Sequence, residues 1–307
     1  MGRTWGGALV GALVATTVVV AADVGTAAAL EEPPPFVRTI RIEGESWPED
    51  LAVGPEGDLW VVDAGGGRVL RYTTGGTLLD EWGGSGSAPG ELTDPSGIDV
   101  GAEGTVYVAD TYNNRIQMFD PTGTLLDVWV PPDPDAFDSI DDVAVDDDGN
   151  VYAVDNHRPP GRMVMRFDPA GDLVDEWGDW GDGPGQMIEP SEVAIGPDGL
   201  VYVADYAQPK VLVFDAAGTL VREFPVGVFG TDIGYPRALA VDDGGSVWVG
   251  TAHARESNVW KYDAFGTLLT RWGPTVAPDP PGDGEYWWGT RSIAVDGSGN
   301  IYVGDAD

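Results

Sequence analysis

The chain of 307 residues carries 51 acidic and 16 basic residues, which gives it a formal net charge of −35. Such a surface repels phosphate backbones and anionic membranes, so we exclude nucleic acid as a partner. The chain has 45 Gly and 24 Pro, and 42% of its residues are hydrophobic, a composition typical of an all-β protein with a core and many turns. The sequence has no Cys, which excludes disulfides and thiolate chemistry.

Residues 1–29 have the pattern of a secretory signal peptide. Arg3 precedes an apolar run from residue 5 to residue 22, and the small residues Ala27–Ala29 are suited to cleavage before Leu30. We therefore predict a secreted or extracytoplasmic protein with no membrane span in its mature chain. The alternative is a membrane anchor retained through residues 5–22, because that run approaches the length needed to span a bilayer.

Residues 30–46 form a predicted lead-in, and residues 47–307 form the predicted repeat domain. Within the lead-in, Phe36–Ile40 (FVRTI) is similar to the later run Leu220–Phe224 (LVREF), so we interpret it as an outer strand. The repeat is a unit of four short strand-like runs separated by turns of Gly, Asn, Asp and Pro. Its clearest copy, Pro95–Trp129, reads PSGIDVGAEGTVYVADTYNNRIQMFDPTGTLLDVW.

The end of the second run in each unit shows the period of the repeat. This position falls at residues 63, 110, 155, 205, 251 and 305, at intervals of 47, 45, 50, 46 and 54. Such a period is typical of four-stranded propeller blades. Apolar residues occupy both the odd and the even positions of VYVAD and RIQMF, which indicates strands that are buried on both faces. The sequence therefore predicts antiparallel four-stranded blades that close into a ring, with six units along the chain.

The repeats resemble those of the NHL-repeat family. This resemblance implies a six-bladed β-propeller of the general shape of TolB-like and SMP-30-like propellers. The last blade is predicted to be incomplete, because the segment from Thr290 to Asp307 supplies its first two strands, Phe36–Ile40 supplies its fourth, and nothing supplies its third. We interpret the chain as a fragment of a longer protein. The resemblance leaves the function open, since propellers host many unrelated activities.

An acid at the end of the second run is followed by a base in most units, as in Asp110 and Arg115. A ring of such carboxylates is able to coordinate a cation. The alternative is a loop clasp, in which the acid caps the turn and the base holds the next strand. In the fifth unit Thr251 replaces the acid and Asn258 replaces the base. This joint loss favours the clasp.

The best candidates for ligand binding lie where the first strand of each unit begins, because equivalent positions of a propeller converge on its central channel. These positions are Glu49, Ser96, Asp141, Ser191, Arg237 and Arg291, with Asp50, Asp142 and Glu192 one residue further. They differ between units while the framework repeats. Acids facing arginines predict a polarised mouth for a divalent cation such as calcium, or for a zwitterionic or carboxylated ligand. Channel ion pairs that bind no ligand are the alternative.

Histidines and aromatic residues belong to the same predicted face. His157 and His253 lie in loops between second and third strands, where imidazole either serves a site or is simply solvated. Trp287 and Trp288, together with Tyr206, predict an aromatic surface for a protein, peptide or glycan ligand. Packing of these rings over the blade edges is the alternative.

We predict a ligand- or protein-binding module that acts through its top face, with no catalytic residue assigned. One alternative is a divalent-metal-dependent hydrolase or lyase at the channel mouth, by similarity in shape to metal-dependent lactonases. Amidating lyases with related repeats use a three-histidine metal centre, and a chain with two His cannot supply one. A structural or sensor domain detached from a longer chain is the third hypothesis.

Overall fold

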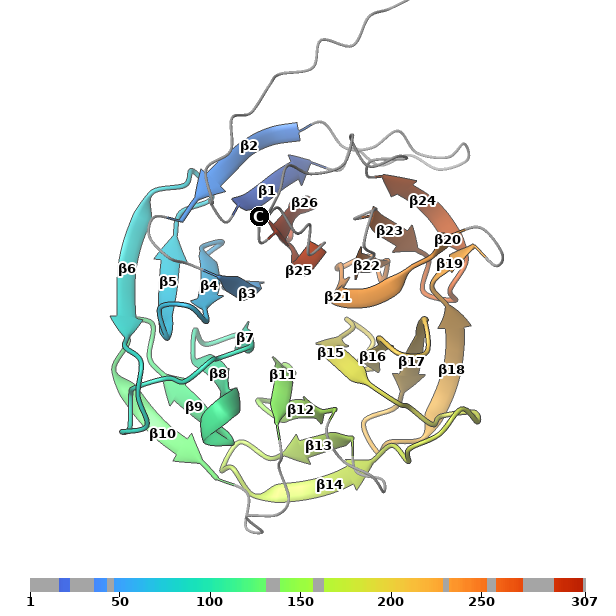
Figure 1. Ribbon diagram of the computed structural model, residues 1–307, viewed down its shortest axis with the longest axis horizontal. Helices are drawn as coiled ribbons and strands as arrows, with labels where there is room; N and C mark the ends of the chain where they lie inside the picture. Colours follow the sequence, from blue (N-terminus) through green and yellow to red (C-terminus); the bar gives the residue numbers. More distant parts are fainter. Residues whose placement is uncertain are drawn as a thin grey trace, which may run out of the picture.

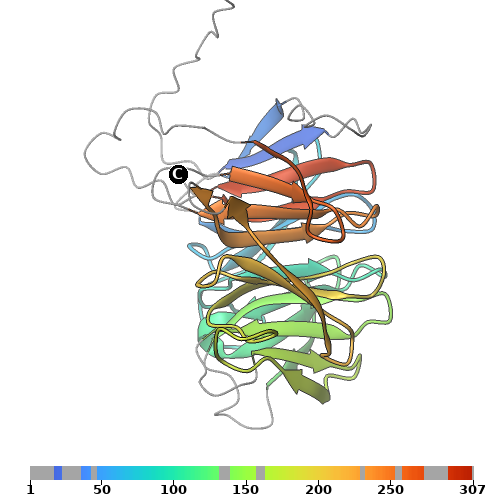
Figure 2. The ribbon, with the colours of Figure 1, turned by 90° about the vertical axis from the view of Figure 1, so that its right-hand side faces the viewer.

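The computed structural model describes residues 17–22, 36–42, 47–130, 139–156, 163–228, 232–252, 258–272 and 290–305. Its four-stranded antiparallel sheets stand around a central axis like the blades of a propeller (Figure 1). Seen from the side, the ring forms a flat disc (Figure 2). The all-β propeller predicted from the sequence is therefore confirmed.

Five blades consist of four consecutive strands each, with the first strand nearest the axis and the fourth at the rim (Figure 1). The first blade consists of β3 (Pro48–Val53), β4 (Leu59–Asp63), β5 (Arg68–Tyr72) and β6 (Leu78–Gly83), and the second of β7 (Gly97–Val100), β8 (Val106–Asp110), β9 (Arg115–Phe119) and β10 (Leu125–Trp129). The third consists of β11 (Ile140–Val145), β12 (Val151–Asp155), β13 (Val164–Phe167) and β14 (Leu173–Trp177), and the fourth of β15 (Pro190–Ile195), β16 (Val201–Asp205), β17 (Lys210–Phe214) and β18 (Leu220–Pro225). The fifth consists of β21 (Tyr235–Val241), β22 (Val247–Ala252), β23 (Asn258–Tyr262) and β24 (Leu268–Trp272). A 3-10 helix, η1 (Thr111–Asn113), follows β8, and a small two-stranded sheet pairs β19 (Gly227–Val228) with β20 (Asp232–Ile233).

The structure corrects the predicted six-bladed pattern with an incomplete last blade. Five blades, not six, are built from consecutive strands. The remaining sheet joins the two ends of the chain in the order β2-β1-β26-β25, where β1 is Thr17–Ala22, β2 is Phe36–Arg41, β25 is Thr290–Val295 and β26 is Asn300–Asp305. The outer strand at residues 36–41 lies where it was expected, but the third strand is not missing, because β1 pairs with both β26 and β2. The sequence reasoning missed β1 because its apolar run also has the pattern of a signal peptide.

Burial along the blades explains the hydrophobic pattern of the repeat. The second strands β4, β8, β12 and β16 are buried along their whole length, whereas most residues of the rim strand β6 are exposed. The core lies between neighbouring blades: Trp60 and Val62 of the first blade pack with Val106, Val108 and Phe119 of the second. Because each blade is covered on both faces, its central strands carry apolar residues at both odd and even positions.

An aromatic residue at the end of several rim strands packs over a turn glycine of the next blade. Gly123 has a φ of +81°, and a methyl group added there would lie 2.6 Å from the ring of Trp82. Gly171 likewise lies against Trp129, and Gly218 against Trp177. Glycine thus supplies both the left-handed backbone and the space for the ring. This contact explains why the glycine and the tryptophan recur together in the repeat.

The recurrent acid at the end of the second strand acts as the predicted clasp in the first two blades. Asp63 accepts a hydrogen bond from Arg68 Nε at 2.8 Å and another from the backbone N–H of Trp47 at 2.8 Å. Asp110 accepts from Arg115 Nε at 2.6 Å. In the fourth blade the acid, at position 205, instead accepts from Gln208, and the base at position 210 bonds to Glu223 and a backbone carbonyl. The clasp joins the turn to the connection that enters the blade.

Within the described ranges, no helix is both long and apolar enough to cross a membrane.

Candidate functional site

The first strands of the blades begin around one opening of the central channel, which we call the channel mouth. Its ring consists of the equivalent positions Glu49, Ser96, Asp141, Ser191, Arg237 and Arg291. Neighbouring blades are tied together there: Ser96 Oγ donates to the backbone carbonyl of Asp141 at 2.6 Å, and Ser191 Oγ donates to that of Pro236 at 3.0 Å. The structure therefore places the predicted mouth residues on adjoining first strands.

Glu49 and Arg291 form an ion pair across the junction between the first blade and the closing sheet. Their side chains are 21% and 12% exposed, respectively, so the pair is largely shielded from water. The arginine of β25 is thus neutralised by a carboxylate of β3. This is the acid–arginine contact that the sequence predicted for the mouth, and it occurs at one of the two arginines.

Arg237 differs from Arg291, although it occupies the equivalent position in the fifth blade. Among the described residues, its guanidinium group has no hydrogen bond and no ion pair. Burial and the nearby positive charge of Arg291 lower its pKa, while Glu49, Tyr206 and Glu192 act on it only through space. Arg237 is partly buried and has no acceptor within the part of the chain that the structure describes, so its guanidinium group has hydrogen-bonding capacity to spare.

Asp141 does not supply the missing negative charge at neutral pH. Its Oδ2 accepts the backbone N–H of Asn156 at 2.9 Å. Burial raises the pKa of Asp141 to about 8, with Asp155 and Glu189 adding to the effect and Arg237 opposing it. The carboxyl group is therefore mostly protonated at pH 7, and it does not neutralise Arg237.

The structure describes one of the three aromatic residues predicted for the site, Tyr206. Tyr206, which follows β16, packs its ring against that of Tyr235 with 5.4 Å between the centroids. Tyr206 is also near enough to influence the pKa of Arg237. The candidate residues His157, His253, Trp287 and Trp288 lie outside the described residues.

Glu192 belongs to a deeper layer of the channel, together with Asp50 and Asp142. Each of these carboxylates accepts a backbone N–H from the first strand of the next blade: Asp50 from Ile98 at 2.8 Å, Asp142 from Val193 at 2.9 Å, and Glu192 from Leu239. Their exposed fractions are 7%, 5% and 6%. The first strands of neighbouring blades do not form a common sheet, so these side chains take the place of ladder hydrogen bonds.

Burial raises the pKa of all three carboxyl groups in this layer. The pKa of Asp50 rises to about 7, and those of Asp142 and Glu192 lie well above the usual range, with mutual repulsion as a further cause. The sequence reasoning missed a fourth channel carboxylate, Asp99, which accepts the backbone N–H of Val145 at 2.8 Å and has a pKa of about 6 because of burial. An acid inside the apolar run GIDV was the signal that pointed to it.

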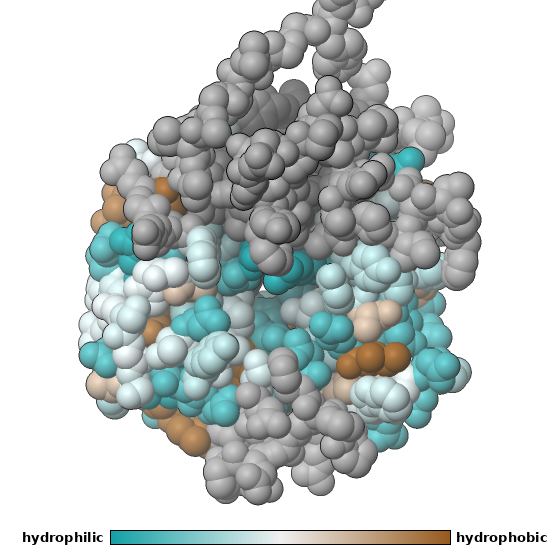
Figure 3. Space-filling model, viewed as in Figure 1, coloured by the Kyte–Doolittle hydropathy of each residue, from teal (hydrophilic) through white to brown (hydrophobic). Residues whose placement is uncertain are grey.

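The carboxylates line a cavity of about 170 Å³ along the axis, bounded by the first strands of all the blades and by β25. The side chains around the central opening are mostly hydrophilic (Figure 3). Within the described ranges, no three His, Asp or Glu side chains are grouped closely enough to ligate one metal ion directly.

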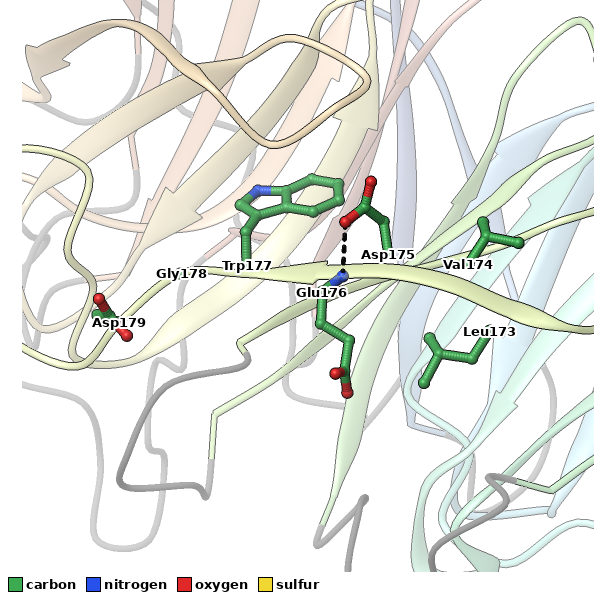
Figure 4. Close-up of a pocket in the computed structure, with 7 residues that line it drawn as sticks. All are labelled: Leu173, Val174, Asp175, Glu176, Trp177, Gly178 and Asp179. Atoms are coloured by element: carbon green, nitrogen blue, oxygen red, sulfur yellow. Dashed lines mark hydrogen bonds between the residues drawn. The ribbon is translucent and has the colours of Figure 1, made fainter.

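A second hollow follows the rim strand β14 and has a different character. Figure 4 shows its lining residues, Leu173–Asp179, with Trp177 on one side of the strand and Glu176 on the other. One strand and the two residues after it form this groove, and the dashed line in Figure 4 marks the hydrogen bond from the Glu176 N–H to Asp175 at 3.2 Å. The groove gathers no groups from separate blades, so the channel is the better site.

Comparison with known proteins agrees with the fold and with the sequence resemblance. Residues 92–119 match the family model of the NHL repeat, and residues 37–72 match that of the strictosidine synthase-like N-terminal region. The resemblance to NHL-repeat proteins is therefore confirmed, and the chain is a β-propeller that carries an NHL repeat.

Solved structures with the same fold include two enzymes. A gluconolactonase from Xanthomonas campestris is 19% identical, with a TM-score of 0.59 over 85% of this chain and 86% of that one. A virginiamycin B lyase from Staphylococcus aureus is 13% identical, with a TM-score of 0.58 over 85% of this chain and 96% of that one. At these identities the likeness shows the fold alone.

One curated relative is the protein brain tumor of Drosophila melanogaster, which is 26% identical over 129 residues. The match covers 42% of this chain and spans only 12% of the length of that relative.

Proposed function

We propose that the protein is a recognition module whose channel mouth binds a carboxylate group of a protein, peptide or glycan ligand. The observation that carries this proposal is the guanidinium group of Arg237, which lies at the mouth without an acceptor among the described residues. The chain has 51 acidic residues, yet none of those described pairs with it.

A ligand carboxylate suits this arrangement for a physical reason. Arg237 is partly buried and has no acceptor among the described residues, so its guanidinium group has lost part of its hydration without compensation, and a planar carboxylate restores two hydrogen bonds at once. Asp141, which burial keeps mostly protonated at pH 7, then offers an O–H donor instead of a repelling charge. Arg291 is paired with Glu49, so it does not compete with Arg237 for the ligand carboxylate.

The aromatic pair beside the mouth supports a ligand larger than a simple ion. Tyr206 and Tyr235 form a tilted ring contact, and Tyr206 lies close enough to Arg237 to influence its pKa. Aromatic rings supply apolar contact area at low entropic cost, and they are common where proteins, peptides and sugars are recognised. A carboxylate that is attached to an amino acid or sugar therefore fits better than a bare inorganic anion.

Calorimetric titration with two matched ligand pairs tests the proposal. The probes are N-acetyl-L-glutamate against N-acetyl-L-glutamine, and D-glucuronate against D-glucose. We expect at least one carboxylate to bind more tightly than its neutral analogue, and Arg237→Gln to weaken it about tenfold or more, as for the loss of a bidentate charge-assisted contact. Arg271→Gln, which changes an exposed arginine on the rim strand β24, is the matched control.

Two results would refute this function. In the first, neither carboxylate binds, or the neutral analogues bind equally well. In the second, Arg237→Gln and Arg271→Gln behave alike. Raising the pH through 8 provides a further check, because ionisation of Asp141 places a second negative charge near the bound carboxylate and must weaken it.

The hydrolase or lyase alternative lacks a comparable observation. The lactonase and lyase neighbours share the fold at under 20% identity, and folds of this kind host many activities. If the purified protein hydrolyses a lactone and Asp141→Asn abolishes this activity, the protein is a hydrolase and the proposed recognition function is wrong.

We also propose that the protein is exported, on the basis of the positively charged and apolar pattern of residues 1–29. Strand β1 lies inside this segment, so cleavage before Leu30 would remove it from the closing sheet. N-terminal sequencing of the protein secreted by a heterologous host tests this: a start at Leu30 supports export with cleavage, and an uncleaved chain retained inside the cells contradicts it.

A further inference from the structure

A carboxylate on the neighbouring blade lies near Arg237 at the channel mouth. Glu189 directly precedes β15 of the fourth blade, and Arg237 is the third residue of β21 in the fifth. We propose that the junction between these two blades binds an amino acid in its zwitterionic form, with the ligand carboxylate at Arg237 and the ligand ammonium group at Glu189. This inference rests on the proposed function, to which it adds the second charge of the ligand and the residue that recognises it.

Contacts between the fourth and fifth blades hold the two positions together. Ser191 Oγ donates a hydrogen bond to the backbone carbonyl of Pro236 at 3.0 Å, so the start of β15 is tied to the residue before Arg237. The rings of Tyr206 and Tyr235, one from each blade, are in contact, with 5.4 Å between their centroids. The two charged side chains therefore leave the backbone on either side of one packed junction.

The backbone of Glu189 is anchored, while its carboxylate is open to a ligand. Its N–H donates to Asp205 Oδ1 at 3.1 Å, and its carbonyl oxygen accepts the N–H of Tyr206 at 2.8 Å. The side chain is exposed and, within the described ranges, makes no hydrogen bond and no ion pair. A carboxylate in this state has all its acceptor positions available for donors of a ligand.

The charges of Glu189 and Arg237 act on one and the same group, Asp141 of the third blade. Burial raises the pKa of Asp141 to about 8, and among the charged groups Glu189 adds to this rise while Arg237 opposes it. Charge interactions weaken with distance and are screened by salt. Since both charges affect the same carboxyl group, they belong to one part of the mouth.

A zwitterion complements these two charges better than a simple carboxylate does. A carboxylate alone can pair with Arg237, but it leaves Glu189 without a donor and meets its repulsion. An amino acid adds an ammonium group, whose three donors suit the Glu189 carboxylate, while its own carboxylate pairs with the guanidinium group. The tyrosine rings at the same junction offer apolar contact to the rest of the ligand.

Calorimetric titration with two zwitterions and their matched analogues tests the inference. L-phenylalanine is compared with 3-phenylpropanoate, which lacks the ammonium group, and with L-phenylalaninamide, which lacks the carboxylate. The second zwitterion, 6-aminohexanoate, is compared with hexanoate. The zwitterions differ in the separation of their charges, so the tighter of the two indicates the distance that the site spans.

We expect at least one zwitterion to bind about two- to fivefold more tightly than its analogue without the ammonium group, as for an ion pair at an exposed carboxylate. L-phenylalaninamide must bind more weakly than L-phenylalanine. Glu189→Gln must bring the zwitterion and its analogue to equal affinity. The matched control Glu103→Gln, which removes an exposed charge from the turn between β7 and β8, must keep the ratio of the wild type.

Zwitterions that bind no more tightly than their analogues overturn the inference, and so does an advantage that Glu189→Gln leaves unchanged. In both cases recognition of a carboxylate still stands if Arg237→Gln weakens the binding of 3-phenylpropanoate or hexanoate. The absence of binding by all five probes also overturns the inference, and the titrations with D-glucuronate and N-acetyl-L-glutamate then decide the proposed function separately.

Discussion

Replacing Asp110 with Ala removes the centre of the most buried clasp. Asp110 has no exposed surface and accepts hydrogen bonds from Arg115 Nε at 2.6 Å, from Gln117 Nε2 at 2.9 Å, from Asn113 Nδ2 at 2.9 Å and from the backbone N–H of Thr93 at 2.7 Å. The side chain of Arg115 is only 9% exposed. The substitution therefore leaves a buried cation without its counter-ion, together with three other donors that lose this acceptor.

Breaking one side of a buried ion pair costs about 3–5 kcal/mol, because the remaining charge is not resolvated. With about 2–4 °C per kcal/mol in a chain of this size, the Tm falls by roughly 6–20 °C. Urea and thermal unfolding followed by circular dichroism measure the change. The matched variant Asp63→Ala leaves Arg68, whose side chain is 25% exposed, so it must cost less. A cost below about 1 kcal/mol for Asp110→Ala, or one equal to that of Asp63→Ala, would refute this reasoning.

Three further predictions concern the channel and the core. In the presence of a metal chelator, the free energy of unfolding falls as the pH rises from about 4 to about 7. Burial raises the pKa of Asp50 from 3.8 to about 7, so the protonated form that favours the folded state is lost across that range. A Tm that rises over the same pH range contradicts this. Gly97→Ala costs roughly 1–3 kcal/mol in urea unfolding through its clash with Asp142, and an unchanged midpoint shows that the channel adapts. Ile116→Ala, at a fully buried position, lowers the free energy of unfolding by about 2–5 kcal/mol. Leu126→Ala, at a position that is 54% exposed, changes it by less than about 0.5 kcal/mol. Equal effects of the two substitutions would mean that burial does not determine the loss of stability.

Local features of the chain are legible in its sequence because they depend on neighbouring residues. A run such as Val106–Asp110 is rich in β-branched and aromatic residues, and turns with Gly at positions such as 123 follow such runs at a steady period. The joint loss of acid and base at positions 251 and 258 predicted the clasp seen between Asp110 and Arg115. The repeat thus predicts strands, turns, blade order and the ring of mouth positions.

The closing sheet depends on contacts that a local pattern cannot specify. Thr17 pairs with Asp305, and Val18 pairs with Gly304, across almost the whole length of the chain. The apolar composition of residues 17–22 is compatible with a leader, an anchor or a strand, and only the neighbouring strands in space distinguish these states. The sequence therefore predicted a gap where the structure has a third strand.

The chemistry of the channel was decided by the tertiary structure for a related reason. The sequence by itself determined that acids and arginines converge on the mouth. It did not determine that Arg291 is paired with Glu49 while Arg237 has no acceptor among the described residues, or that Asp142 keeps one oxygen unsatisfied. Pairing and burial depend on distances of a few ångströms between blades, and charge interactions change steeply over such distances in a low-dielectric interior.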